Sequence, residues 1–433
     1  MKTQLVKQRM SVLAFAILWM LTVGGSQLAQ SQTYNKIWDF TGGTDGDSPY
    51  AGLTIDKYGV MYGTTTASSS GYGTVFKLTG SGSNWNLTTL YSFGGAENHD
   101  GQYPMARLTV AADGSLYGTT AFGGNPNDCQ FVPYGGCGTI FRLRSPGNVC
   151  LAGPGKCPWK ETVIHEFSGI PDGALPMAEV TFDSKGNLYG TTATGGFQGG
   201  CYDQNGCGTV FKYEHSNSNW TLSETYSFIG FLGANGVGQP GSGVILDSAG
   251  NVYGTTACCW GPAGNNTIFK LVSSGTGWSE SDIYAFQPQN DGDFPYGTLI
   301  ADNTGNFYGT TSNHGANGGG TAFQFTTSGT FHTLASFSGY PNGQCGPWGG
   351  LVMDASSNLY GTTQCDGAYG WGSVFELKLV GGTYQYVSLY DFTGGTDGGY
   401  PYGALVMDSN GYLYGTASQG GNNRLGVVFR VKP

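Results

Sequence analysis

Charged residues are scarce in this sequence of 433 residues, making up 11% of it, whereas an average soluble domain has about 25%. The few charges are also unbalanced, with 18 basic and 28 acidic residues. Nucleic-acid binding needs clustered Lys and Arg side chains that neutralise phosphates. The composition therefore argues against a nucleic-acid partner.

Motifs of known catalytic or metal chemistry are absent from the sequence. It contains no His-Glu-x-x-His, no Gly-x-Ser-x-Gly elbow, no phosphate-binding loop and no Cys-x-x-Cys doublet. Only five histidines are present, and they are scattered. We therefore expect no metal ion and no cofactor, and the sequence identifies no catalytic residue.

Long hydrophobic runs are missing too. The longest, from Val12 to Val23, follows Lys2, Lys7 and Arg9 and is too short for a membrane helix, which needs about 20 apolar residues. With the small residues after it, this pattern predicts a secretory signal peptide over residues 1–31; a retained membrane anchor is the alternative. We expect a secreted, periplasmic or cell-surface protein with no membrane span after cleavage.

What the sequence has in abundance is glycine, with 77 residues, together with 27 Tyr and 24 Phe. No Gly-X-Y period is present, which excludes collagen. So many aromatic and β-branched residues can bury a core, which argues against disorder. The composition is typical of a β protein rich in turns.

Three short signatures recur along the chain. Asp-Gly with a following Pro comes first, Tyr-Gly-Thr-Thr second and Gly-Thr-Val-Phe third, with degenerate copies of each. Seven copies of the second signature start at Tyr62, Tyr117, Tyr189, Tyr253, Tyr308, Tyr360 and Tyr414. Repeats of this kind indicate one structural unit repeated seven times.

Each repeat reads as four strands, which in the first repeat are expected near residues 51–56, 60–66, 73–78 and 85–93. Repeat seven stops after its third strand, and the segment Tyr34–Phe40 resembles the fourth strand of the other repeats. We therefore predict an all-β, seven-bladed β-propeller of four-stranded antiparallel blades, closed by the N-terminal strand. It forms a single domain over residues 32–433; a parallel β-solenoid is the alternative.

An aspartate recurs at the predicted turn between the first two strands of a repeat. Asp and Gly in a tight hairpin indicate a turn, because Asp can bond the backbone of the turn itself. We interpret these residues as turn aspartates rather than catalytic ones. They are Asp56, Asp183, Asp247, Asp302, Asp354 and Asp408.

The ten cysteines predict disulfides, since an even number in an exported chain is typical of bridged proteins. For the adjacent Cys258 and Cys259 the sequence allows two states, a vicinal disulfide bridge or two free thiols. The spacing of the other eight predicts four bridges: Cys129–Cys137, Cys150–Cys157, Cys201–Cys207 and Cys345–Cys365.

The repeat unit resembles the GloVer repeat of exported bacterial tandem-repeat proteins. The resemblance rests on the Asp-Gly…Pro, Asn-Leu-Tyr-Gly-Thr-Thr and Gly-Thr-Val-Phe segments, for example Asn187–Thr192. It extends over the chain that follows the predicted signal peptide, and it implies export. The family supplies no catalytic residues.

Candidate ligand-binding residues cluster at the predicted start of the innermost strand. Aromatic residues follow the motif proline in several blades, and blades two and three place a charged residue two positions further on, where the other blades have small ones. Aromatic side chains in two loops extend the set. The candidates are Tyr50, Tyr296, Trp348, Tyr402, Arg107, Glu179, Trp260 and Trp371. The alternative is a structural role, as a salt bridge for the charged pair and as packing between blades for the aromatic residues.

These observations favour a non-enzymatic binding or scaffold module whose ligand is a glycan or a cell-surface protein. The alternative is a carbohydrate-active enzyme, a hydrolase or lyase, with its site at the mouth of the propeller channel. An enzyme needs titratable groups that converge in one pocket. We expect a monomer.

Overall fold

A computed structural model describes residues 33–129, 134–146, 158–197, 206–216, 219–228, 239–257, 266–274, 277–339 and 345–433. The chain divides into two units, Met1–Thr33 and Tyr34–Pro433. The second unit holds all the strands named below. The predicted signal peptide, residues 1–31, lies outside the described residues.

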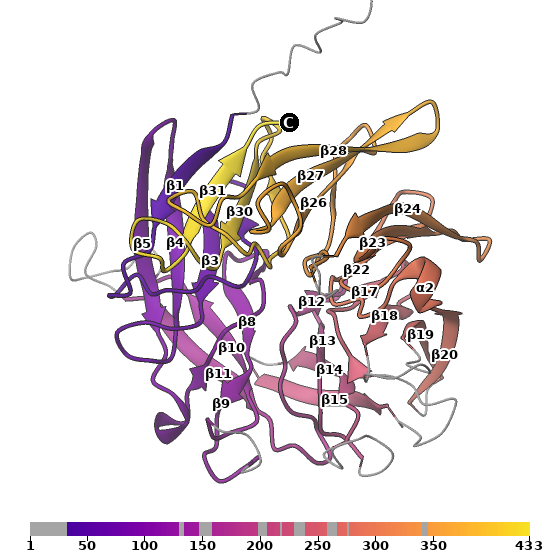
Figure 1. The fold of residues 1–433 in the computed structure, drawn as a ribbon. Helices are drawn as coiled ribbons and strands as arrows, with labels where there is room; N and C mark the ends of the chain where they lie inside the picture. Colours follow the sequence, from indigo (N-terminus) through magenta and orange to yellow (C-terminus); the bar gives the residue numbers. More distant parts are fainter. Residues whose placement is uncertain are drawn as a thin grey trace, which may run out of the picture. The chain divides into compact units, whose positions relative to one another are not determined.

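Tyr34–Pro433 forms a seven-bladed β-propeller (Figure 1), as the repeats predict. Each blade is an antiparallel sheet built on four strands that follow one another from the inside outwards, and the sheet of blade four has a fifth, short strand. Blade one consists of β2 (Thr54–Ile55), β3 (Met61–Thr65), β4 (Thr74–Ser81) and β5 (Asn84–Ser92).

The other blades repeat this order. Their strands are, from blade two to blade seven, β7 (Thr109–Val110), β8 (Leu116–Thr120), β10 (Thr139–Arg144) and β11 (Lys160–Glu166); β12 (Thr181–Phe182), β13 (Leu188–Thr192), β14 (Thr209–Ser216) and β15 (Asn219–Ser227); β17 (Ile245–Leu246), β18 (Val252–Ala257), β19 (Thr267–Ser273) and β20 (Trp278–Ala285); β21 (Ile300–Ala301), β22 (Phe307–Thr311), β23 (Gly318–Phe325) and β24 (Phe331–Ser338); β25 (Val352–Met353), β26 (Leu359–Thr363), β27 (Ser373–Val380) and β28 (Thr383–Asp391); β29 (Val406–Met407), β30 (Leu413–Ala417), β31 (Val427–Val431) and β1 (Asn35–Asp39).

A few short elements lie in the connections between these strands. They are β6 (Gly101–Gln102), β9 (Phe122–Gly123), β16 (Gln239–Pro240), a 3-10 turn at Ala96–Asn98 and α2 (Pro288–Asp291). β6 pairs with β9, and single bridges join the corresponding connections of other blades. The loop that enters a blade and the loop between its second and third strands therefore lie together on one face, which we call the loop face.

The N-terminal strand closes the ring, as predicted. β1 pairs antiparallel with β31, and Asn35 lies opposite Arg430; Figure 1 shows the two strands side by side. Closure gives blade seven its fourth strand and covers an edge that would otherwise be free to pair with another chain.

The glycine of each Tyr-Gly-Thr-Thr signature makes room for the phenylalanine of the next signature. A Cβ atom at Gly309 would lie 2.6 Å from Cζ of Phe323 and 2.9 Å from a methyl group of Leu299. In all seven blades the corresponding distance to Cζ is 2.5 or 2.6 Å. The two signatures therefore recur together because the ring of one fills the space above the glycine of the other.

The threonines of the same signature hold the blades together. The hydroxyl of the first one donates to a backbone carbonyl of the next blade at 2.7 to 3.1 Å, and Thr416 completes the ring by donating to Ala51 of blade one. The second threonine pairs with a Thr or Ser hydroxyl on the third strand in six blades. In blade seven both partners are apolar, since Ala417 lies opposite Val427.

The repeated aspartates act as turn residues, in agreement with the interpretation from the sequence. Asp302 accepts hydrogen bonds from the backbone N–H groups of Thr304 and Asn306 and from the phenol of Tyr308. Burial acts to raise its pKa, but the hydrogen bonds outweigh burial and lower the pKa of Asp302 to about 2.

The innermost strand is shorter than predicted. In blade one only Thr54–Ile55 pairs with β3, although residues 51–56 are expected to do so. The carbonyl of Ala51 bonds blade seven instead, and a Cβ atom at Gly52 would lie 2.3 Å from the carbonyl oxygen of Ala404. The residues before the strand therefore pack against a neighbouring blade rather than within their own.

Candidate functional site

A cavity of about 780 Å³ lies at the inner ends of the blades. The residue after the motif proline lines it in all seven blades, and we call these residues the mouth level. They are Tyr50, Met105, Met177, Gly241, Tyr296, Trp348 and Tyr402. Two positions further along the chain lies an inner level, consisting of Gly52, Arg107, Glu179, Thr298, Gly350 and Ala404.

Four aromatic rings of the mouth level pack on one another in an arc. Tyr296 stacks on Trp348 with centroids 4.6 Å apart, Trp348 meets Tyr402 edge-on at 5.7 Å, and Tyr402 lies 4.9 Å from Tyr50. All four side chains are half-buried. The arc therefore joins blades five, six, seven and one and also forms one wall of the cavity.

Glycines beside the aromatic residues explain why the rings meet. A Cβ atom at Gly349 would lie 2.6 Å from the backbone nitrogen of Ala404, and one at Gly403 would lie 2.3 Å from that of Gly52. No side chain fits at these contacts, so the backbones of neighbouring blades approach directly. The rings attached to these backbones are brought into contact with one another.

The residue before the motif proline has a left-handed backbone in five blades, with φ between 53° and 57°. Such a backbone costs a non-glycine residue about 1 kcal/mol or more. At Tyr103 the N–H donates to Tyr72 of the preceding blade, while its carbonyl accepts from Ala121 of its own blade. The strained residue therefore links two blades and fixes the direction in which the proline and the mouth-level residue enter the cavity. The five are Ser48, Tyr103, Leu175, Phe294 and Tyr400.

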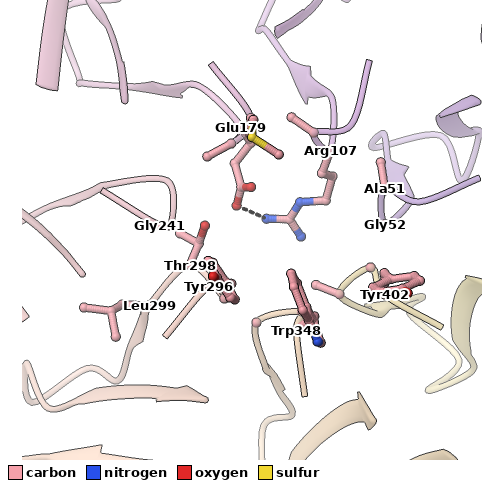
Figure 2. A pocket seen from close by; sticks show the side chains of 18 of the residues that line it. Ala51, Gly52, Arg107, Glu179, Gly241, Tyr296, Thr298, Leu299, Trp348 and Tyr402 are labelled. Atoms are coloured by element: carbon pink, nitrogen blue, oxygen red, sulfur yellow. Dashed lines mark hydrogen bonds and ion pairs between the residues drawn. The ribbon is translucent and has the colours of Figure 1, made fainter. Parts of the chain in front are cut away.

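Arg107 and Glu179 face the arc from the opposite wall (Figure 2). One contact joins them, from Nη2 of Arg107 to Oε1 of Glu179 at 3.5 Å. Their side chains are 37% and 21% exposed. The structure thus brings together the two charges that sequence patterning singles out, and it makes them an ion pair.

The aromatic arc carries polar atoms as well, namely the hydroxyls of its tyrosines and the indole N–H of Trp348, and these keep their protons at neutral pH. Burial, with Tyr50 nearby, raises the pKa of Tyr402 to about 12, and its hydroxyl accepts a hydrogen bond from Gln364 at 2.6 Å. Burial also raises the pKa of Tyr296. Nε1 of Trp348 is buried and has no hydrogen-bond partner in the described part of the chain.

The two candidate loop tryptophans differ from the rest. Trp371 is not among the residues that line the cavity; its ring packs edge-on to Tyr400 at 5.0 Å and lies where a Cβ atom of Gly394 would be. It therefore packs between blades six and seven. Trp260 lies outside the described residues.

Two predicted disulfides are confirmed, Cys129–Cys137 and Cys345–Cys365. The second joins the entry loop of blade six to the loop between its second and third strands, on the loop face. Cys207 is disulfide-bonded. The other cysteines of the prediction lie outside the described residues: Cys150, Cys157, Cys201, Cys258 and Cys259.

The described residues contain neither a membrane-spanning helix nor a cluster of metal-ligating side chains. None of their helices is long and apolar enough to cross a membrane. None of their His, Cys, Asp and Glu side chains form a group of three or more placed to hold a metal ion.

The fold and cavity define a β-propeller closed by its N-terminal strand. Residues 239–433 match the Gloeobacter/Verrucomicrobia repeat, which confirms over those residues the resemblance drawn from the sequence. No curated protein matches the chain.

Solved structures similar to this chain include proteins of different kinds. One is a protein of unknown function from Dyadobacter fermentans, at 12% identity and a TM-score of 0.44, with 92% of this chain and 97% of that chain covered. A Lactobacillus plantarum protein has 14% identity and a TM-score of 0.49, with 83% and 88% covered. The GH93 alpha-L-arabinofuranosidase of Fusarium graminearum has 12% identity and a TM-score of 0.44, with 92% and 97% covered. Likeness at this level assigns no activity to this chain.

Proposed function

We propose that this protein is an exported, non-enzymatic binding module that holds a saccharide in the cavity at the centre of its propeller. The observation that carries the proposal is the pairing of two unlike walls, one aromatic and one bearing Arg107 and Glu179. Ligand sites commonly combine an apolar surface with a few polar groups that fix orientation. A sugar ring has both kinds of surface, with C–H groups on its faces and hydroxyls around its edge.

The composition of the cavity favours binding over glycoside hydrolysis. Hydrolysis ordinarily uses two carboxyl groups roughly 5 to 10 Å apart. Among the described residues that line the cavity, Glu179 supplies the one carboxylate. The enzymatic alternative therefore has less support, and product analysis of any glycan that binds tests it directly.

Export is part of the proposal. The signal-peptide pattern of residues 1–31 supports it, and so do the disulfides, which persist mainly in oxidising compartments. Export can be measured by fractionating cells of the native host and detecting the protein in each fraction with an antibody against it. Recovery of the full-length chain from the cytoplasm would contradict export.

A glycan-array screen of the purified propeller tests binding, followed by calorimetry on each glycan that binds. Trp348→Ala is expected to weaken affinity at least tenfold, because it removes the centre of the aromatic wall. It also removes stacking with Tyr296, so its melting temperature must be measured alongside. Tyr58→Ala is the control, because Tyr58 is an aromatic residue that is 79% exposed in a hairpin turn and does not line the cavity. Equal affinities of the Trp348 variant and the parent protein would place the ligand elsewhere.

A further inference from the structure

The ion pair in the cavity uses little of its hydrogen-bonding capacity. An arginine carries five N–H donors, and a carboxylate accepts at about four positions. Only one contact joins Arg107 to Glu179, and its length of 3.5 Å exceeds the 2.7–2.9 Å of a strong charge-assisted hydrogen bond. The remaining donors and acceptors lie beside the cavity, where a ligand reaches them.

The pair is also electrically balanced. The other residues that line its level carry no charge: Gly52, Thr298, Gly350 and Ala404. An anionic ligand there would be attracted by Arg107 and repelled by Glu179, and a cationic ligand would experience the reverse. A charge on the ligand therefore adds little net attraction. Affinity depends instead on how well neutral hydrogen-bond donors and acceptors of the ligand match those of the pair.

Two hydroxyls on adjacent ring carbons match this arrangement. One accepts from the guanidinium while the other donates to the carboxylate, and their oxygens lie roughly as far apart as two hydrogen-bonded oxygens, about 2.8 Å. The pair and the aromatic arc line the same cavity from opposite walls. One saccharide in the cavity can therefore contact the arc with its ring faces and the pair with its hydroxyls.

We propose that the cavity selects a neutral saccharide with a free vicinal diol, whose two hydroxyls bridge Arg107 and Glu179. This inference rests on the proposed function, because it names the ligand class of the same site. Uronic acids, sulfated sugars and amino sugars bind more weakly, because their charged group loses hydration in the cavity and receives no net attraction from the balanced pair.

Calorimetry with defined hexamers tests the selection. The neutral probes are cellohexaose, mannohexaose and xylohexaose; the anionic probe is the galacturonic acid hexamer and the cationic probe is the glucosamine hexamer. At least one neutral hexamer is expected to bind ten times more tightly than either charged one. Preference of the wild-type protein for a charged hexamer overturns this inference and leaves saccharide binding intact, whereas no binding by any hexamer removes the proposed function itself.

Two variants distinguish selection by the Arg107–Glu179 pair from nonspecific binding of saccharides. Arg107→Gln leaves a net negative charge, so preference is expected to shift about tenfold towards the glucosamine hexamer. Glu179→Gln is expected to shift it by a similar factor towards the galacturonic acid hexamer. Arg142→Gln is the matched control, because Arg142 forms an ion pair with Asp113 at 2.7 Å and does not line the cavity. Melting curves establish that each variant is folded, and unchanged preference in both cavity variants refutes the role of the pair.

Discussion

Replacing the glycine of one Tyr-Gly-Thr-Thr signature with alanine tests the packing that makes each blade. We choose Gly309→Ala in blade five, where Tyr308, Thr310 and the paired strands on both sides are described. The added Cβ atom would lie 2.6 Å from Cζ of Phe323 and 2.9 Å from Leu299, closer than carbon atoms approach. One of the two side chains must move.

The expected cost follows from overpacking. Phe323 is fully buried and packs against Phe286 and Phe331, so it has little room to move. Inserting a carbon into such a core costs about 1 to 3 kcal/mol. Phe323→Leu alone leaves a void and costs about 1 to 2 kcal/mol, part of the 3 to 5 kcal/mol of a Phe→Ala change. The void and the extra methyl group occupy the same space, so the double variant is expected to cost less than the sum of the single ones.

Urea unfolding followed by tryptophan fluorescence and circular dichroism measures the four proteins of this cycle. Gly43→Ala is the control, because a Cβ atom there finds its nearest neighbour at 3.4 Å and its φ lies outside the left-handed region. The midpoint of Gly309→Ala is expected to fall well below that of the control. Equal midpoints, or strictly additive costs in the double variant, would refute the account of why glycine and phenylalanine recur together.

Three further predictions concern the ring, a disulfide and pH. Thr416→Val removes the hydroxyl that bonds blade one and leaves a buried carbonyl unpaired, which is expected to cost about 1 to 3 kcal/mol in chemical unfolding, and a Thr416→Ser variant should recover most of it. Replacing Cys345 and Cys365 by serine opens a loop of 20 residues and is expected to cost about 3 kcal/mol in chemical unfolding. Burial, with the nearby charge of Asp100, raises the pKa of Glu161 from 4.5 to about 8. Because the unfolded chain releases this proton at lower pH than the folded protein, stability should fall as pH rises from 4.5 to 8. Thermal melts of Glu161→Gln should be flatter over that range, and parallel curves for both proteins would contradict the shift.

The sequence predicts the architecture well because each blade repeats the same local rules. The number of blades, the order of their strands and the closing segment at Tyr34–Phe40 all follow from counting signatures and finding the incomplete one. Pairing of Cys129 with Cys137 follows from their short separation. Local patterns are sufficient for these features.

Contacts between blades are harder to predict. Tyr296 and Trp348 follow the motif proline, and this place in the repeat predicts that they lie at the central opening. It does not predict that their rings stack on each other. Stacking depends on how closely neighbouring backbones approach, and the signal for this approach is the glycine after each ring in blades five to seven, such as Gly349. Blades two and three, which contribute no ring to the arc, have alanine at the same position, such as Ala106.

The seven junctions between blades are built alike, and this has a consequence for the engineering of this protein. The junction between blades seven and one uses the same hydroxyl-to-carbonyl bond as the other six, so the ring has no structurally unique joint. Asn35 lies opposite Arg430 in the closing pair, which places the two ends of the propeller within reach of a short peptide linker. A circular permutant that joins these ends and opens at another hairpin turn keeps all seven junctions. The hairpin turns lie on the same face as the present ends, opposite the loop face, because Asn35 and Arg430 form the end of the closing pair that is remote from Val427. A fused enzyme or fluorophore at either kind of position would leave the mouth of the cavity clear.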